Sequence, residues 1–240
     1  MNRKRRVFLA TAGVMLLAGC AASGQDRGRG MKIGVIGSGR IGGALGEFWV
    51  KAGHEVVFSA RTIEEVNALV ARLNLGPRAR AGTPREAAAF GEVVLISVPY
   101  AALPQIGRDL AEELKGKVVL ETGNPYPERD GDMAVAARAK GTGVASAEFL
   151  PGVRLVRAFN SVGDRPLRSQ AGRFGERVAI PLAADDAEAM KIAAKLVEDA
   201  GFEPVPVGPL SRAREFDFGT RVYGYALTAR QLRWELGIRN

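Results

Sequence analysis

Cysteine and histidine are nearly missing from this sequence, which contains one of each, Cys20 and His54. One residue of each kind cannot form an intramolecular disulfide or a zinc site rich in cysteine and histidine. A Ser-His-Asp or Cys-His nucleophilic site is also disfavoured, because His54 lies between a predicted helix and a predicted strand, where we expect a structural role. We therefore predict no metal site and no side chain that acts as a catalytic acid, base or nucleophile.

Basic runs with interleaved aromatic residues are also absent, although the formal net charge is +8. Residues 1–19 contain four basic groups and no acidic one, so the remainder has an excess of 8 − 4 = +4. A mild, scattered excess does not predict nucleic acid as a partner. No stretch after Cys20 is long and apolar enough to span a bilayer.

The first 30 residues have the layout of an export signal. Basic residues 3–6 precede an apolar run of about a dozen residues, and small residues lead to Cys20. The segment RRVFL resembles a twin-arginine motif, and LAGC resembles a lipobox. We predict a twin-arginine lipoprotein signal over 1–19 and a flexible tether over 20–30. The protein would be exported, in the periplasm or anchored through lipid on Cys20; the alternative is a cytoplasmic protein that starts at Met31.

After Met31, short runs of Val, Ile and Leu alternate with amphipathic segments. Such alternation predicts strands buried on both faces and connected by helices in parallel order. The expected fold is α/β: a Rossmann-type, doubly wound, mostly parallel sheet with helices on both faces. Residues 31–150 would form the nucleotide-binding domain, and residues 151–240 a small α/β extension that completes the sheet and the acceptor site. Strands are expected at 32–37, 55–59, 92–98, 117–121, 154–159, 177–183 and 203–207, and helices at 40–52, 62–74, 84–90, 101–115, 131–139, 185–200 and 222–236.

Three glycines mark the junction of the first predicted strand and the first predicted helix. The segment from Gly37 to Gly42 reads G-S-G-R-I-G, which is the G-x-G-x-x-G pattern of dinucleotide-binding folds. In this position Gly37 would permit a tight turn, Gly39 a close approach of a pyrophosphate, and Gly42 close helix–strand packing. The start of the following helix favours an anion. The alternative is a glycine-rich turn without a ligand.

The end of the second predicted strand bears on which dinucleotide binds. An NAD site usually has an acidic residue here for the ribose hydroxyls, but this sequence reads FSART from residue 58. Arg61 can pair with an adenosine 2′-phosphate, and Ser59 and Thr62 can add hydroxyl contacts. We therefore predict NADP(H) in preference to NAD(H). The alternative is that Arg61 is the solvated start of the next helix.

From Met31 to about Tyr225 the chain resembles the F420-dependent NADP reductase family, and it is similar also to the oxidoreductase domain of the STEAP metalloreductases. The matching segments follow the family's order: KIGVIGSGRIGGAL, GHEVVFSAR, VLISVPYAAL, ETGNPY, RLVRAFNSV and FEPVPVGPLSRAREFD. The resemblance implies NADP(H) as cofactor, and coenzyme F420 or a flavin as co-substrate. It places on the nucleotide Gly37, Ser38, Gly39, Arg40, Ile41, Gly42, Arg61, Ser97, Val98, Pro99, Asn124, Pro125 and Asn160, the last three near the nicotinamide.

Two departures from the family pattern weaken the expected grip on a 2′-phosphate. The family usually reads Gly-Ser-Arg where this chain reads Ser59-Ala60-Arg61, and a basic residue common shortly afterwards is replaced by Glu64-Glu65. Hydride transfer between stacked rings needs proximity and exclusion of water more than a side-chain acid, which suits a chain without a catalytic histidine.

Several assignments remain open. The amides of Asn124 and Asn160 either orient the nicotinamide carboxamide or cap turns. Arg212 and Arg214 either receive an acidic tail or form a solvated helix face, while packing is expected for Phe216, Phe218, Tyr223, Tyr225 and Trp234. The expected partner is a small-molecule electron acceptor, with a homodimer left open. The alternatives to a reductase are a lipid-anchored NADP(H)-binding protein without turnover, and an imine or β-hydroxyacid reductase, which the predicted strands after residue 150 disfavour.

Overall fold

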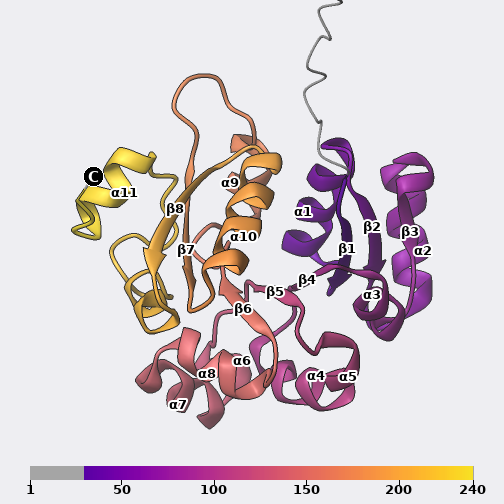
Figure 1. The fold of residues 1–240 in the computed structure, drawn as a ribbon, viewed down its shortest axis with the longest axis horizontal. Helices are drawn as coiled ribbons and strands as arrows, with labels where there is room; N and C mark the ends of the chain where they lie inside the picture. Colours follow the sequence, from indigo (N-terminus) through magenta and orange to yellow (C-terminus); the bar gives the residue numbers. More distant parts are fainter. Residues whose placement is uncertain (1–29, 240) are drawn as a thin grey trace, which may run out of the picture.

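Eight strands form one sheet in the order β3-β2-β1-β4-β5-β6-β7-β8 (Figure 1). The computed structural model describes residues 30–239, so the predicted signal, Cys20 and nearly all of the predicted tether lie outside the described residues. Neighbouring strands are parallel except β6 and β7, which pair antiparallel. The strands are β1 (Lys32–Ile36), β2 (Glu55–Ser59), β3 (Ala79–Ala81), β4 (Val93–Ile96), β5 (Val118–Glu121), β6 (Arg154–Arg157), β7 (Ala179–Ala184) and β8 (Glu203–Gly208).

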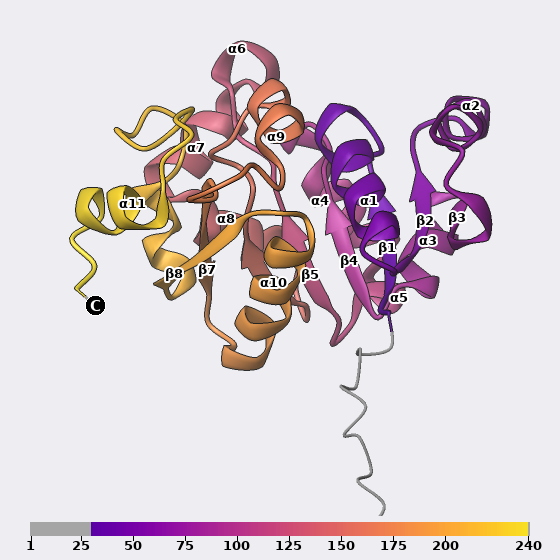
Figure 2. The ribbon, with the colours of Figure 1, turned by 90° about the horizontal axis from the view of Figure 1, so that it is seen from above.

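Helices cover both faces of the sheet (Figure 2), which confirms the predicted doubly wound α/β fold. The helices are α1 (Arg40–Lys51), α2 (Ile63–Leu73), α3 (Pro84–Phe90), α4 (Leu103–Asp109), α5 (Ala111–Leu114), α6 (Pro127–Asp130), α7 (Asp132–Lys140), α8 (Thr142–Phe149), α9 (Asp164–Gln170), α10 (Ala187–Asp199) and α11 (Ala229–Glu235). Three short 3₁₀ segments are η1 (Gly76–Arg78), η2 (Tyr100–Ala102) and η3 (Leu210–Glu215).

Three buried clusters form the core. Helices α1, α2, α9 and α10 pack on one face of the sheet, and α3, α4, α5, α7 and α8 pack on the other. A smaller cluster joins β7 and β8 to η3 and α11. On the first face, Trp49 of α1 is fully buried, and its indole Nε1 donates a hydrogen bond to the Leu196 carbonyl of α10 at 2.8 Å. Among residues 30–239, no helix has the length and apolar character needed to cross a membrane.

Local signals fix several helix starts. Thr83 and Glu86 form a capping box at α3, and Pro84 occupies the first turn, where its missing N–H costs nothing. The Asp186 carboxylate accepts from the Ala189 amide and caps α10. These starts lie within two residues of the predicted ones, because capping chemistry is readable in the sequence.

Other elements differ from the predictions. The predicted helix over 101–115 is two helices, because Leu110 leaves the helical region (φ −117°, ψ 18°) between α4 and α5. The predicted helix over 222–236 shrinks to α11: Gly224 has φ +85°, and Thr228 starts the helix with its own capping box. The sequence patterns did not predict β3, α6, α8 and α9, all of which are eight residues or shorter.

Candidate nucleotide-binding site

A cleft of about 1140 Å³ opens at the carboxyl ends of β1 and β4. The strand order reverses there, since β1 pairs with β2 on one side and with β4 on the other. Open α/β sheets bind ligands at such switch points. Of the predicted site residues, seven line this cleft: Gly37, Ser38, Gly39, Arg61, Ser97, Val98 and Pro99.

The first glycine makes the turn that the pattern predicts. Gly37 has φ +92°, and a Cβ there would overlap the Ser97 carbonyl oxygen, so only glycine fits without strain. The amides of Gly37 and Ser38 both donate to the Ser59 carbonyl, at 3.0 and 2.9 Å, and the Ser38 hydroxyl donates to the same oxygen at 2.9 Å. These donors hold the turn against β2, which is a different task from the expected contact with a pyrophosphate.

The start of α1 faces the cleft without a side-chain cap. Gly39 is the N-cap residue, no side chain accepts from the first turn, and a Cβ on Gly39 would meet no protein atom within 4 Å. Uncapped first-turn amides and the helix dipole make this end suited to an anion. The Arg40 side chain is exposed, with Nη1 3.5 Å from an Asp164 oxygen. Ile41 packs against the core.

The third glycine sits where the helix touches the turn. A Cβ on Gly42 would overlap the carbonyl oxygen of Gly37. Gly42 is therefore a packing residue, as the pattern predicts, and does not line the cleft.

At the end of β2 the structure corrects the predicted contact of the Ser59 hydroxyl and gives the Thr62 hydroxyl a backbone partner. Ser59 is fully buried, and its hydroxyl donates to the Val35 carbonyl at 2.8 Å, so it does not reach the cleft. The Thr62 hydroxyl accepts from the Glu65 amide at 3.4 Å and caps α2. Both hydroxyls serve the backbone because the strand end and the helix start each need an internal partner. Arg61 alone of the three lines the cleft.

Helices α2 and α4 also line the cleft, which the sequence motifs did not predict. Glu65 and Arg72 line it from α2, and Ile106 lines it from α4. Helical spacing could have found Arg72, since positions 65, 68, 69 and 72 share one face of α2. Val66, Leu69, Ile106 and Pro84 give this part of the cleft an apolar lining suited to a planar base.

The predicted nicotinamide residues are buried together beyond the cleft lining. The Asn124 side-chain amide donates to the Asn160 carbonyl at 2.8 Å, and the Asn160 amide lies 3.3 Å from the Phe216 carbonyl. These bonds brace the turns after β5 and β6, which is the turn-holding role that the sequence left open. Pro125 is also buried. The Asn160 Oδ1 atom has no hydrogen-bond partner within residues 30–239, and a buried acceptor of this kind is rare in proteins.

The C-terminal segment contains Arg212 and Arg214, for which the sequence leaves open either an acidic-tail site or a solvated helix face. Arg212 pairs with Glu215 at 2.7 Å, and Arg214 donates to the Lys140 carbonyl at 2.8 Å, so both guanidinium groups have internal partners. Phe216 is fully buried. The prediction of packing fails for Tyr225 and Trp234, whose exposed fractions are 64% and 83%. Local sequence does not reveal the exposure of these two side chains, because exposure depends on which elements pack nearby.

Two further aromatic side chains contact other aromatic rings beside the turn after β5: Tyr223, and Phe218, which is nevertheless 36% exposed. The Phe218 ring lies 4.8 Å from Tyr126 and 5.2 Å from Tyr223, both edge-on, and the two tyrosine hydroxyls are 2.7 Å apart. Burial and this hydrogen bond raise the pKa of Tyr223 above its usual range. Tyr223 is therefore neutral at physiological pH.

A fully buried ion pair ends β5 and β6 and was also missed. Arg157 is 0% exposed and Glu121 1% exposed, and the Arg157 Nη1 atom donates to the Glu121 carboxylate. Burial raises the pKa of Glu121, while the neighbouring guanidinium opposes that shift. The pKa of Arg157 is raised because the Glu121 and Asp217 carboxylates outweigh its burial, so the guanidinium stays charged. The sequence signal that could have predicted this pair is a charged residue at the end of a buried strand: Glu121 ends β5 and Arg157 ends β6.

His54 has the structural role that we expected. Its Nδ1 accepts from the Met31 amide at 3.0 Å, and its Nε2 lies 3.1 Å from an Asp199 oxygen. Because Nδ1 accepts, Nε2 carries the proton and donates to Asp199. Within the described residues, no group of three or more His, Cys, Asp or Glu side chains is arranged to hold a metal ion.

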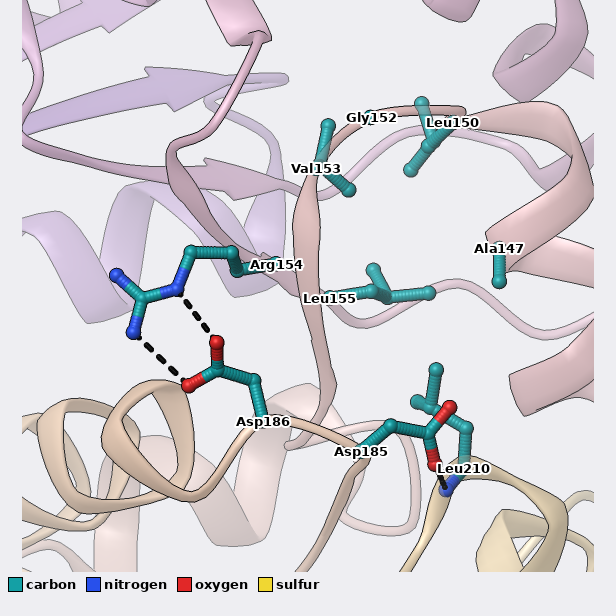
Figure 3. A pocket seen from close by; sticks show the side chains of 9 residues that line it. All are labelled: Ala147, Leu150, Gly152, Val153, Arg154, Leu155, Asp185, Asp186 and Leu210. Carbon is teal, nitrogen blue, oxygen red and sulfur yellow. Dashed lines mark hydrogen bonds and ion pairs between the residues drawn. The ribbon is translucent and has the colours of Figure 1, made fainter.

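A second cavity, of about 380 Å³, lies between α8, β6 and the start of α10 (Figure 3). Arg154 there forms two hydrogen bonds with Asp186, at 2.8 and 2.9 Å. The neighbouring Asp185 accepts from the Leu210 amide at 2.9 Å. Since Arg154, Asp185 and Asp186 are all partnered within the chain, we assign this cavity no ligand.

The Asp186 carboxylate predicts a pH-dependent contribution to stability. Its hydrogen bonds with Arg154 and the Ala189 amide hold its pKa well below the usual range, so it stabilises the fold above the unfolded-state pKa of about 3.9. Asp186→Ala should lower the melting temperature at pH 7 by roughly 2–4 °C. The difference should shrink as the pH falls below about 4, as followed by circular dichroism. A difference that stays constant down to pH 2 would assign the effect to packing.

Comparisons with known proteins agree with this geometry. Residues 32–125 match the family model for NADP oxidoreductase, coenzyme F420-dependent. The F420-dependent NADP reductase of Methanothermobacter marburgensis is 31% identical over 196 residues, covering 77% of this chain and 87% of that protein. Rat metalloreductase STEAP3 is 27% identical over 190 residues, and the match spans only 36% of its length.

A solved structure shows the same fold. The putative F420-dependent NADP-reductase from Arthrobacter sp. FB24 superimposes with a TM-score of 0.67 at 22% identity, covering 77% of this chain and 88% of that one. At this identity the likeness speaks for the fold alone.

Proposed function

Since this chain belongs to the family of F420-dependent NADP reductases, we propose that it transfers hydride between NADP(H) and a deazaflavin (F420) or flavin ring. The chain is an NADP-dependent oxidoreductase. The observation that carries the proposal is the cleft at the β1/β4 switch point, which combines an uncapped helix start with Arg61 and an apolar wall. The identity of the hydride acceptor, F420 or a flavin, is what we propose.

The start of α1 would hold the pyrophosphate. A Cβ on Gly39 would meet no protein atom within 4 Å, so the space beside its backbone is open. A ligand can approach the backbone there, whereas a side chain at this position would block it. The uncapped amides of the first turn of α1 are the donors that an anion needs. The residues present therefore fit a dinucleotide.

Arg61 would bind the adenosine 2′-phosphate. It lines the cleft, and no ion pair involves it among the described residues, so its guanidinium is available to a phosphate. Glu65 lines the same cleft and would repel that phosphate. The grip on NADP(H) would therefore be weaker than Arg61 alone would provide.

The nicotinamide end would lie along Ser97, Val98 and Pro99, toward the turn that contains Asn124. This placement follows from the cleft lining, which includes these three residues but not the buried Asn124 and Asn160. Bound NADP(H) supplies the hydride chemistry, and the protein aligns the ring and excludes water. No side chain needs to act as an acid in hydride transfer between two bound rings.

The test mixes the purified chain with NADPH and, in separate reactions, oxidised F420, FMN or FAD, and follows the loss of NADPH absorbance. We expect turnover with F420 or with a flavin, and each result names the acceptor class. Tight NADPH binding without turnover with any acceptor would contradict the proposal. That outcome would favour an NADP(H)-binding protein that lacks reductase activity.

A further inference from the structure

The buried ion pair at the ends of β5 and β6 belongs to a larger network. Arg157 uses Nη1 for the Glu121 carboxylate and Nη2 for the Gly123 carbonyl, at 2.9 Å, and Nη2 also lies 3.5 Å from an Asp217 oxygen. Glu121 accepts from the Gly123 amide through its other oxygen. The turn after β5 is therefore held at Gly123 by both its amide and its carbonyl.

This turn touches the wall of the nucleotide cleft. The Thr122 hydroxyl donates to the Ser97 hydroxyl at 3.0 Å, and Ser97 lines the cleft. A continuous chain of contacts thus runs from Arg157 through Gly123 and Thr122 to a residue of the binding site. The same turn continues into Asn124, whose amide holds the Asn160 carbonyl at 2.8 Å.

Asp217 connects this turn to the C-terminal segment. Its carboxylate accepts from the Thr142 amide at 3.1 Å and from the Thr142 hydroxyl, and it lies 3.5 Å from the Asn160 amide. Asp217 follows η3, so it is distant in sequence from every partner. One carboxylate therefore joins the C-terminal segment to α8, to β6 and to the loop that contains Asn160.

The network is a poor way to stabilise a core. Desolvating a guanidinium and two carboxylates is costly, and apolar residues of similar volume often stabilise an interior at least as well. Charged groups can instead fix the position of the backbone that they contact, because their hydrogen bonds have preferred directions and lengths. The network lies beside the cleft wall, where the position of a bound ring would matter most.

We propose that Asp217, Arg157 and Glu121 are positioning residues: they hold the turn over 122–124 and Ser97 in the place that the nicotinamide ring requires. Through Asp217, this placement depends on the C-terminal segment. The inference rests on the proposed function for its rate measurement, because hydride transfer depends steeply on ring alignment. Its second readout needs only bound NADPH.

The test uses Asp217→Asn in the full chain, with Asp186→Asn as the matched control. Asp186 also pairs with an arginine, but it belongs to the second cavity and has no contact with the network. Three quantities are measured for each variant: the NADPH dissociation constant, the fluorescence of the bound nicotinamide, and the single-turnover rate with the acceptor that the wild type uses.

For Asp217→Asn we expect a hydride-transfer rate about 10–100-fold lower, with an NADPH dissociation constant within about threefold of wild type. The adenosine half of the cleft keeps its contacts, so most binding survives. Bound-nicotinamide fluorescence should become weaker and red-shifted as the ring gains contact with water. The control should match wild type in all three.

Two outcomes would overturn the proposal: an Asp217→Asn variant equal to wild type in rate and fluorescence, or one that loses NADPH affinity and rate by the same factor. If that variant unfolds, Thr122→Val removes only the link to Ser97, and it should reproduce the fluorescence change without altering a charge. A wild type that reduces no acceptor would refute the proposed function, yet the fluorescence comparison would still decide whether Asp217 positions the ring.

Discussion

Replacing Arg61 by alanine is expected to raise the KM for NADPH by about 10–100-fold while changing the KM for NADH less than threefold. Arg61 lines the cleft just after β2, and no carboxylate ends that strand to bind ribose hydroxyls. A charge-assisted hydrogen bond contributes about 1.5–3 kcal/mol, which corresponds to this range of fold-changes. Steady-state kinetics with both reduced nucleotides measures the difference directly.

Two neighbours on α2 provide the controls for Arg61. Glu65→Gln removes a negative charge from the cleft and should lower the KM for NADPH by roughly threefold at low salt, with a smaller effect at high salt. Arg72→Ala removes a cation from the same cleft, more than two helical turns beyond Arg61, and should change the KM less than threefold. Equal losses with NADPH and NADH in Arg61→Ala would mean that Arg61 does not recognise the 2′-phosphate.

The second large effect separates two glycines of one motif. Gly42→Ala should destabilise the fold by at least about 2 kcal/mol, because its Cβ would overlap the Gly37 carbonyl and backbone atoms would have to move. The melting temperature should fall by about 4–8 °C in a domain of this size. Moving α1 away from the turn should also weaken NADPH binding.

Gly39→Ala is the matched comparison for Gly42→Ala. Its Cβ would meet no protein atom, so the melting temperature should stay within about 2 °C of wild type. NADPH affinity should nevertheless fall by about tenfold, since the added methyl group stands where the pyrophosphate would approach the backbone. Thermal melts and fluorescence titrations on both variants test this. Unchanged affinity in Gly39→Ala would remove the pyrophosphate from the start of α1.

Sequence alone was sufficient for the fold class and for the main outline of the cleft. Runs of Val, Ile and Leu, such as residues 93–96, predict the buried strands. The G-x-G-x-x-G pattern predicts the turn after β1, because the backbone at Gly37 has a conformation that favours glycine. Arg61 was predictable for the same kind of reason, since it follows the second strand by two residues. Each of these signals lies within a few residues of the feature that it predicts.

Only the tertiary structure decided which polar groups face a ligand and which hold the protein together. From the sequence, the Ser59 and Thr62 hydroxyls could bind a phosphate. In the structure, each of them forms a hydrogen bond with a nearby backbone group. Glu121 and Arg157 are 36 residues apart, and Asp217 reaches Thr142 across 75 residues. Hydrogen-bond partners are chosen by three-dimensional proximity, and burial makes each choice obligatory because an unpaired polar group is costly. Periodicity therefore determines the elements of this protein, while packing determines the tasks of its polar side chains.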